Sequence, residues 1–176
     1  MEIDDSKLKI LYTPNDIKER VKTLATEIDN TYNGKEVVLL IVLKGAFIFA
    51  ADLCRAMKTK HTMEFIRAKS YIGETSSGAV NITNVGTNSD LSGKHVLIVE
   101  DIVDTGLTLM KLIERLQKEN CKSIKVCTLL DKPERREHDI NPDFSGFKLK
   151  GSPFVLGYGL DVDEYHRDLP YIGVNE

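Results

Sequence analysis

The sequence predicts an α/β protein with a mostly parallel central sheet flanked by helices. Short runs of apolar, β-branched residues alternate along the chain with segments whose apolar residues recur at helical spacing. The clearest run is VVLLIVL at 37–43, which has no polar position and is typical of a parallel strand covered on both faces. Strands that alternate with helices in this way usually lie parallel in one sheet.

The first predicted helix begins after Thr13. The hydroxyl of Thr13 can cap the helix, Pro14 suits its first turn, and Asp16 would lie near the positive end of the helix dipole. Apolar residues follow at helical spacing, and an Asn-Gly pair at 33–34 predicts a turn. We therefore expect a helix directly before the 37–43 strand.

Further strands are expected at 63–71, 96–99 and 124–130, with helices between them. Residues 72–93 are rich in Gly, Ser, Thr and Asn and are too long for a plain connector, which predicts a mobile flap or an irregular hairpin. A last apolar run at 154–160 lies in a C-terminal stretch with several Gly and Pro, which we expect to form a small hood over the sheet rather than extend it.

The bulk properties exclude some classes of protein. The 176 residues fit one domain, so we expect a single domain over 1–176. The 24 basic and 27 acidic residues, a formal net charge of −3, argue against binding to nucleic acid through bulk basicity, although a local basic patch stays open. Apolar runs are far shorter than the roughly 18 residues of a membrane span, and three cysteines without C-x-x-C spacing suggest reduced thiols. We expect a soluble, cytoplasmic protein that binds no membrane.

Chemically useful residues gather after the 96–99 strand. Glu100 and Asp101 follow it, and a loop at 104–108 (DTGLT) opens the next helix. Loop amides, threonine hydroxyls and a helix N-terminus together favour a phosphate group. Adjacent carboxylates suit ribose hydroxyls or a hydrated Mg²⁺. Asp104 and Thr105 could instead merely cap the helix, but the two acids directly upstream favour a ligand site.

Five segments resemble the motifs of a known family. VLIVEDIVDTGLT at 96–108 is similar to the phosphoribosyl-diphosphate signature of type I phosphoribosyltransferases. The remaining segments resemble, in order, motifs of the hypoxanthine-guanine phosphoribosyltransferases, and the resemblance continues to 170–173. They are VLKG at 42–45, KSY at 69–71, LDKP at 130–133 and FVLGYGLD at 154–161.

The resemblance implies roles on the ribose-phosphate side. Glu100 and Asp101 would hold the ribose hydroxyls, and the 5-phosphate would lie in the 104–108 loop. That loop consists of Asp104, Thr105, Gly106, Leu107 and Thr108. Asp104 would be the general base or acid near purine N7, a role that requires proximity to the transferred proton. Glu100 and Asp101 would also contribute to a Mg²⁺ site.

Other roles concern the pyrophosphate. Lys44 and Gly45 would place backbone amides against it, and Arg167 would contact it as a permanent forked cation. Asp161 would hold a second Mg²⁺ near it. Without the family context, Lys44 is an ordinary solvated lysine and Arg167 belongs to a surface ion pair with Asp168.

The remaining roles concern the base and the flap. Lys132 would donate to the 6-oxo group, and because an ammonium cannot accept a hydrogen bond, adenine would be rejected by roughly 10⁴. Phe154 would stack on the base and Val155 would present its backbone to it. Ser70 and Tyr71 would belong to a flap that closes over the site. A turn lysine and a core phenylalanine are the alternatives for Lys132 and Phe154.

These expectations define a function. The chain would transfer the phosphoribosyl group from 5-phosphoribosyl diphosphate to N9 of hypoxanthine or guanine, with Mg²⁺, giving IMP or GMP and pyrophosphate. The resemblance also implies a homodimer or homotetramer. An RNA-binding regulator of the same fold and a phosphoacceptor receiver domain are the alternatives. The ranking of hypoxanthine, guanine and xanthine stays open, and Val162, where many relatives carry an aromatic residue, adds to that uncertainty.

Overall fold

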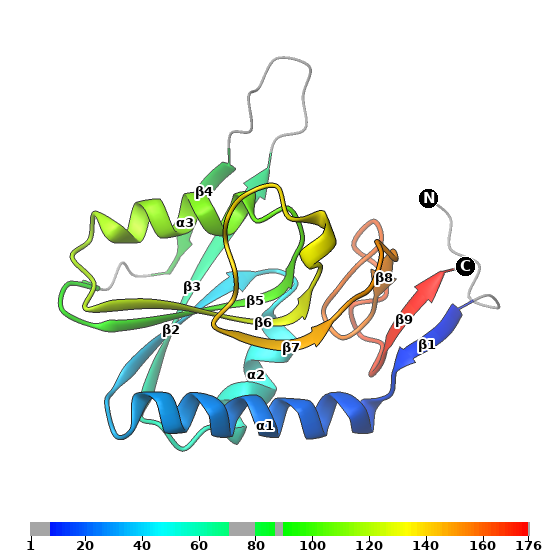
Figure 1. Ribbon diagram of the computed structural model, residues 1–176, viewed down its shortest axis with the longest axis horizontal. Helices are drawn as coiled ribbons and strands as arrows, with labels where there is room; N and C mark the ends of the chain where they lie inside the picture. The colour runs from blue at the N-terminus through cyan, green and yellow to red at the C-terminus, as the bar shows by residue number, and fades with distance from the viewer. Residues whose placement is uncertain (1–7, 71–79, 87–89, 176) are drawn as a thin grey trace, which may run out of the picture.

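The computed structural model describes residues 8–70, 80–86 and 90–175, and its centre is a six-stranded sheet (Figure 1). The strand order is β4-β3-β2-β5-β6-β7, and all neighbours are parallel except β3 and β4. The strands are β2 (Val37–Leu43), β3 (His61–Ser70), β4 (Val80–Val85), β5 (His95–Val103), β6 (Ser123–Asp131) and β7 (Phe144–Lys148). The predicted fold class is confirmed.

A second, antiparallel sheet forms the hood. It contains β1 (Leu8–Tyr12), β9 (Ile172–Asn175) and β8 (Val155–Leu156), in that order. In Figure 1 it lies at the right, beyond the carboxyl ends of the central strands. Tyr12 stacks on Phe147 of β7 with ring centroids 3.9 Å apart, so the hood is packed against the edge of the central sheet. The expected small hood is therefore present, and it uses both ends of the described chain.

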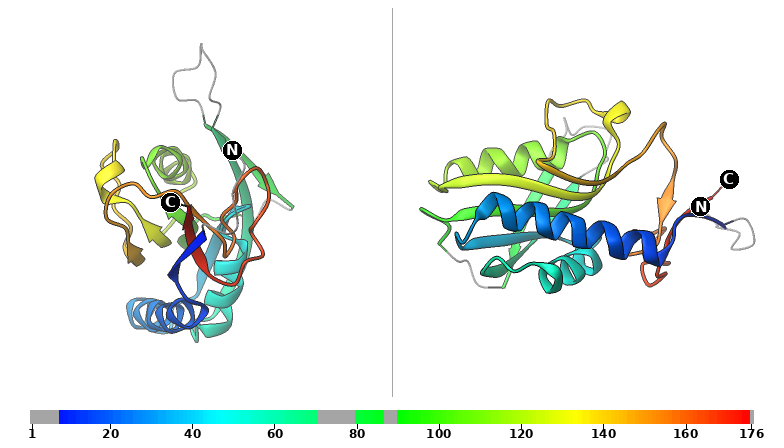
Figure 2. Two further views of the ribbon diagram at one scale, coloured as in Figure 1. Left: turned by 90° about the vertical axis from the view of Figure 1, so that its right-hand side faces the viewer. Right: turned by 60° about the horizontal axis from the view of Figure 1, so that its bottom comes forward.

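Helices cover both faces of the central sheet, as Figure 2 shows. The helices α1 (Pro14–Tyr32) and α2 (Phe47–Ala56) lie on one face, and α3 (Leu107–Gln117) lies on the other. The N-cap predicted at Thr13 is confirmed, and it is one half of a capping box, because Thr13 Oγ1 accepts from the Asp16 amide at 3.2 Å and Asp16 accepts from the Thr13 amide at 2.9 Å.

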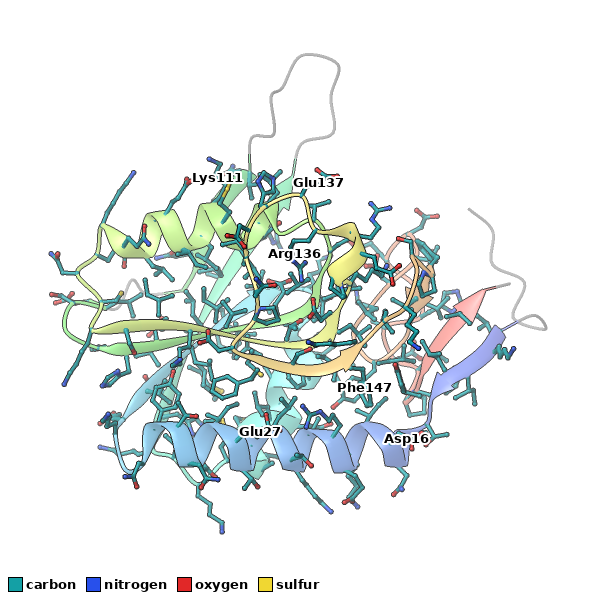
Figure 3. The ribbon with its side chains drawn as sticks, viewed as in Figure 1. Asp16, Glu27, Lys111, Arg136, Glu137 and Phe147 are labelled. Carbon is teal, nitrogen blue, oxygen red and sulfur yellow. The ribbon has the colours of Figure 1, made fainter. Side chains whose placement is uncertain are left out.

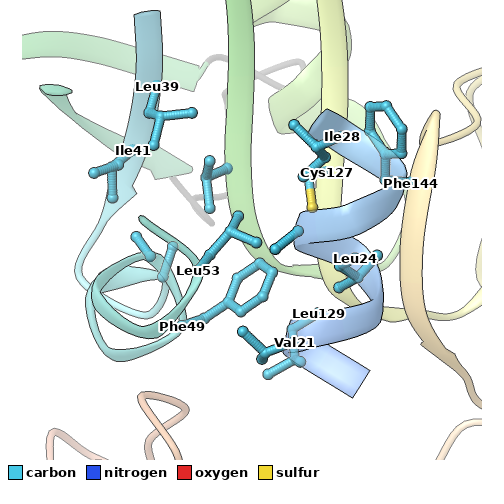
Figure 4. Packing of buried hydrophobic residues seen from close by; sticks show 14 of the residues in the cluster. Val21, Leu24, Ile28, Leu39, Ile41, Phe49, Leu53, Cys127, Leu129 and Phe144 are labelled. Atoms are coloured by element: carbon cyan, nitrogen blue, oxygen red, sulfur yellow. The ribbon is translucent and has the colours of Figure 1, made fainter. Parts of the chain in front are cut away.

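The alternation of side chains along the strands divides the core into two clusters. Odd-numbered residues of β2 pack under α1 and α2, whereas its even-numbered residues pack under α3. In Figure 4, Phe49 and Leu53 of α2 and Leu24 of α1 meet Cys127 and Leu129 of β6. Strands buried on both faces require apolar residues at every position, which explains the unbroken run in β2.

The limits of β3 and β6 differ from the expected ones by one or two residues, whereas two other strands differ more. β5 extends to Val103 because Glu100, Ile102 and Val103 continue to pair with β6, so the two acids lie within the strand rather than after it. The prediction of a strand at 154–160 was wrong beyond Leu156. Gly157, Tyr158 and Gly159 all have positive φ and form a tight turn there.

The segment expected to form a flap lies partly outside the described residues. Residues 71–79, which include Tyr71, and residues 87–89 are not among them. The described part contains β4, which pairs antiparallel with β3 and continues the hairpin to Ser70. The hairpin alternative is thus supported for 80–85.

Candidate active site

Three loops meet where the adjacent parallel strands β2, β5 and β6 end. Lys44 follows β2, Asp104 follows β5, and Lys132 follows β6. β5 pairs with both β2 and β6, so these loops are neighbours although they are far apart in the sequence. The carboxyl edge of an open α/β sheet is where such folds bind ligands.

Two neighbouring carboxyl groups lie near the end of β5. Asp101 Oδ1 accepts from the Ile102 amide at 2.8 Å, and the carboxyl groups of Glu100 and Asp101 share a hydrogen bond. Burial, followed by the charge of Asp101, raises the pKa of Glu100 well above its usual value, and burial also raises the pKa of Asp101. Glu100 Oε2 is buried and has no hydrogen-bond partner among the described residues. It can therefore accept from a ligand.

Glycine residues allow three segments to approach one another beside these acids. A Cβ atom on Gly45 would lie 1.6 Å from Asp101 Oδ2, and one on Gly159 would lie 2.1 Å from the Gly45 carbonyl oxygen. The loop after β2 is thus sandwiched between β5 and the turn at Gly159. The peptide bond between Leu43 and Lys44 is cis. Only residues without a side chain fit at positions 45 and 159.

The 104–108 loop lines a hollow of about 240 Å³ together with Glu100 and the end of β5. Gly106, with φ of 89°, is the N-cap of α3, and the Thr105 hydroxyl accepts from the Leu107 amide at 3.4 Å. The helix begins without a side-chain cap on Gly106, which leaves backbone amides of its first turn for a ligand. The N-cap of α3 is therefore Gly106 rather than Asp104 or Thr105.

A segment after β6 supports this loop. The amides of Glu137 and His138 donate to the Thr105 carbonyl at 3.0 and 3.1 Å. Arg136, labelled in Figure 3, forms an ion pair with the buried Asp131 and donates to the Asp104 carbonyl. These contacts fix the backbone of the 104–108 loop from outside.

Arg135 and Lys132 surround the Asp104 side chain. Arg135 Nε lies 2.8 Å from Asp104 Oδ1. Lys132 is 7% exposed, and burial lowers its pKa although the nearby charge of Asp104 opposes this shift. Sequence reasoning missed Arg135 and Arg136, and the only signal was the Arg-Arg pair that follows the LDKP motif.

Four charged groups form a cluster next to the loop after β2. Arg167 Nη2 contacts Asp161 Oδ1 at 2.8 Å and Glu164 Oε2 at 3.1 Å, while Lys44 Nζ lies 2.9 Å from the same Glu164 oxygen. The charge of Arg167 also reaches Asp101, where it opposes the rise in pKa that burial causes. The three predicted residues of this cluster are thus together, whereas Glu164 was not predicted. Among the described residues, Arg167 forms its ion pairs with Asp161 and Glu164 and not with Asp168, the alternative partner.

The residues predicted to contact the base or to belong to the flap lie at two places, the hood and the end of β3. Phe154 is 48% exposed, which contradicts the alternative that it is a core residue. Val155 is buried in β8, where it pairs with Val174. Ser70 ends β3, and Tyr71 lies outside the described residues. An exposed aromatic ring is available for stacking on a flat ligand.

Glu100 and Asp101 are the acids best suited to a cation. Within the described part of the chain, no group of three or more His, Cys, Asp or Glu side chains is arranged as a metal site. The unpartnered Glu100 Oε2 fits either a hydrated divalent cation or hydroxyl donors. Both oxygens of Asp161 already accept, one from Arg167 and the other from the Glu164 amide at 2.9 Å.

Comparison with known proteins identifies the family. Residues 8–164 match the family model described as "Phosphoribosyl transferase domain". The chain belongs to the phosphoribosyltransferase family. A hypoxanthine-guanine phosphoribosyltransferase of Aquifex aeolicus strain VF5 is 46% identical, over 97% of this chain and 96% of that protein. The enzyme of that name from Bacillus subtilis strain 168 is 44% identical, over 94% of this chain and 92% of that protein.

A solved structure agrees with this assignment. The hypoxanthine phosphoribosyltransferase of Staphylococcus aureus superposes with a TM-score of 0.91 at 40% identity, covering 97% of this chain and 93% of that chain. The resemblance noted in the sequence motifs is thereby confirmed, and family membership excludes the receiver-domain alternative. No helix among the described residues is long and apolar enough to cross a membrane.

Proposed function

We propose that this phosphoribosyltransferase transfers the 5-phosphoribosyl group of 5-phosphoribosyl diphosphate to N9 of hypoxanthine or guanine, giving IMP or GMP and pyrophosphate. The observation that carries the proposal is the meeting of Asp104, Lys132 and the Glu100–Asp101 pair at the carboxyl ends of neighbouring strands. A loop for the phosphate, two carboxyl groups for the ribose hydroxyls and a donor for the base would thus lie close together.

The ribose 5-phosphate is assigned to β5 and the loop that follows it. The hollow lined by 104–108 offers helix amides to the phosphate, and Glu100 and Asp101 offer acceptors to the ribose hydroxyls. Because Glu100 Oε2 is buried without a hydrogen-bond partner among the described residues, a ribose hydroxyl could donate to it. This arrangement positions C1 of the ribose for transfer.

The purine is assigned to the space between Asp104, Lys132 and Phe154. Asp104 would exchange the N7 proton through Oδ2, since Arg135 contacts the other oxygen, Oδ1. Lys132, a donor held nearly out of solvent, would recognise the 6-oxo group, and the exposed Phe154 ring would stack on the base. This donor excludes adenine, which presents another donor at that position.

The pyrophosphate is assigned to the loop after β2 and to Arg167. Gly45 and Gly159 allow the backbone of that loop to approach the ligand, and Arg167 Nε has no hydrogen-bond partner among the described residues. Glu100 and Asp101 would hold one Mg²⁺, and Asp161 would hold another near the pyrophosphate. The metal would supply positive charge to offset that of the diphosphate. The protein groups themselves bind and orient the leaving group.

The assembly is proposed to be a homodimer or homotetramer. Phe47, Met63, Phe65 and Val85 are between 37% and 48% exposed. Met63 and Phe65 pair with β2 residues that face α2, and Phe65 pairs with Val85, so these side chains share the sheet face beyond α2. A second copy could cover this apolar face.

We also propose that 1–176 is a single domain and that the enzyme acts in the cytoplasm, without nucleic acid.

A panel of bases tests the proposed function. The purified protein is incubated with 5-phosphoribosyl diphosphate and hypoxanthine, guanine, xanthine or adenine, with and without Mg²⁺, and both pyrophosphate and nucleotide are measured. We expect products with hypoxanthine or guanine only when Mg²⁺ is present, and none with adenine. Tight RNA binding that weakens steeply with salt, without turnover of any purine, would instead support the regulator.

A further inference from the structure

Glu164 brings a negative charge into the group of cations assigned to pyrophosphate. Its Oε2 atom lies 2.9 Å from Lys44 Nζ and 3.1 Å from Arg167 Nη2. Hydrogen bonds from Lys44, and then from Arg167, lower the pKa of Glu164, so its side chain is an anion at neutral pH. One carboxylate therefore contacts both Lys44 and Arg167, and Arg167 also contacts Asp161 at 2.8 Å.

The backbone holds Glu164 in this place despite an unfavourable conformation. Asp163 and Glu164 have φ of 51° and 73°, the left-handed region that residues other than glycine rarely adopt. They form the tip of a two-residue hairpin, closed by hydrogen bonds of 3.1 and 2.9 Å between Val162 and Tyr165. Asn-Gly or Gly-Gly usually occupies such a turn. The Glu164 amide also donates to Asp161.

Stability does not account for this arrangement. The side chains of Lys44 and Glu164 are 49% and 61% exposed, and an ion pair this exposed contributes about 0 to 1 kcal/mol. Arg167 is 19% exposed, but it keeps its contact with Asp161 at 2.8 Å when Glu164 leaves. A left-handed conformation for a residue other than glycine costs a similar amount or more. A strained residue that forms weak ion pairs with two functional cations points to a role in ligand binding.

We propose that Glu164 is the internal counter-ion of the pyrophosphate subsite. The diphosphate displaces its carboxylate from Lys44 and Arg167, and the carboxylate returns to both cations when pyrophosphate leaves. Substrate binding is thus an exchange of one anion for another, which weakens the hold on the diphosphate and speeds product release. The inference rests on the proposed function, since that function assigns Arg167 and the loop after β2 to pyrophosphate, and it adds the Lys44 side chain of that loop as a second cation.

Titration calorimetry with sodium pyrophosphate tests the inference on the full-length protein. Glu164→Gln removes the charge with little change of shape, and Glu164→Gly removes the side chain at a φ that glycine adopts freely. Glu36→Gln is the matched control. Glu36 is an exposed partner of Lys60 at 3.1 Å, and it precedes β2 at the opposite end of that strand from Lys44.

Both Glu164 variants should bind pyrophosphate about three- to tenfold more tightly than the wild type, as expected for the loss of two ion-pair contacts made by an exposed carboxylate. The difference should shrink in high salt. The control should bind as the wild type does, and the melting temperature of Glu164→Gly should not fall. Equal or weaker binding in the Glu164 variants would overturn the inference, and weaker binding only with Mg²⁺ would make Glu164 a metal ligand instead.

The same titrations separate this inference from the proposed function. If the wild type forms nucleotide from a purine but the Glu164 variants bind pyrophosphate unchanged, only the counter-ion role is wrong. If no purine is converted but the Glu164 variants bind pyrophosphate more tightly, the transfer reaction is wrong and the anion exchange stands. If no variant binds pyrophosphate, the counter-ion role is overturned together with the subsite.

Discussion

Gly45 and Asp101 lie so close together that a Cβ atom on residue 45 would be 1.6 Å from Asp101 Oδ2. The loop after β2 and the acids of β5 therefore form one packed unit, and a change in either displaces the other. This contact joins the region assigned to pyrophosphate to the region assigned to ribose.

Gly45→Ala should lower kcat/KM by on the order of 100-fold, because a displacement of about 1 Å in a catalytic group can cost that much. Steady-state kinetics measure the effect, and thermal melting shows whether the fold persists. Gly34→Ala is the control. Gly34 has φ of 80° but no atom within 4 Å of an added Cβ, so its substitution should cost about 1 kcal/mol of stability and no activity. Equal activity losses in the two variants would refute the packing argument.

Glu100 should make stability fall as pH rises. Its pKa is raised above the ordinary value of 4.5, so the folded state binds more protons than the unfolded state between 4.5 and the raised pKa. The stabilisation is fully present below the ordinary pKa and is lost as pH passes through the raised one. Denaturation with urea in the presence of EDTA, repeated across this pH range, measures the decline.

Glu100→Gln removes the ionisable group, so the stability of this variant should decline less as pH rises. Asp101 retains a smaller pH dependence of the same sign. At neutral pH the variant should be about 0.5 to 2 kcal/mol more stable than the wild type. Parallel pH profiles for the two proteins would show that burial of Glu100 does not determine the stability of this region.

Lys132→Met should increase stability and lower activity. Burial lowers the pKa of Lys132, which means that its ammonium is less stable in the folded protein than in water. We expect a gain of about 0.5 to 2 kcal/mol in the free energy of unfolding at neutral pH. We also expect a loss of about 10- to 100-fold in kcat/KM for hypoxanthine, from the missing charged hydrogen bond.

The exposed Lys122 provides the control for this substitution. Lys122→Met should leave both stability and kinetics nearly unchanged. A Lys132→Met enzyme that still prefers hypoxanthine to adenine as strongly as the wild type does would contradict the role of Lys132 in base recognition.

The sequence predicted elements whose cause is local. The strand at 37–43 was predicted with its observed limits, because burial on both faces requires an apolar residue at every position. The helix begins directly after Thr13, as the Thr13 hydroxyl and Pro14 predicted. The hollow at the 104–108 loop lies where the sequence predicted a site, because its residue types directly follow an apolar strand.

Features that depend on distant pairing could not be predicted. β1 was missed because its partner β9 lies at the other end of the chain, where Leu8 pairs with Asn175. The contact between Arg135 and Asp104 joins residues 31 positions apart and exists only because β5 and β6 are adjacent. In the sequence, Arg135 is indistinguishable from a solvated arginine.

Asp104 is the group proposed to exchange the N7 proton of the base, and Asp104→Asn tests that role. Asparagine keeps the shape of the side chain but cannot take up the proton, so turnover with hypoxanthine should fall by about 10²- to 10⁴-fold. Affinity for 5-phosphoribosyl diphosphate should change little, because the loop amides and the Arg136 contact to the Asp104 carbonyl remain. The decisive measurement is kcat beside the dissociation constant of the diphosphate in both proteins. A large loss of kcat with nearly unchanged diphosphate binding is the predicted result, whereas equal losses in both would contradict the catalytic role of Asp104.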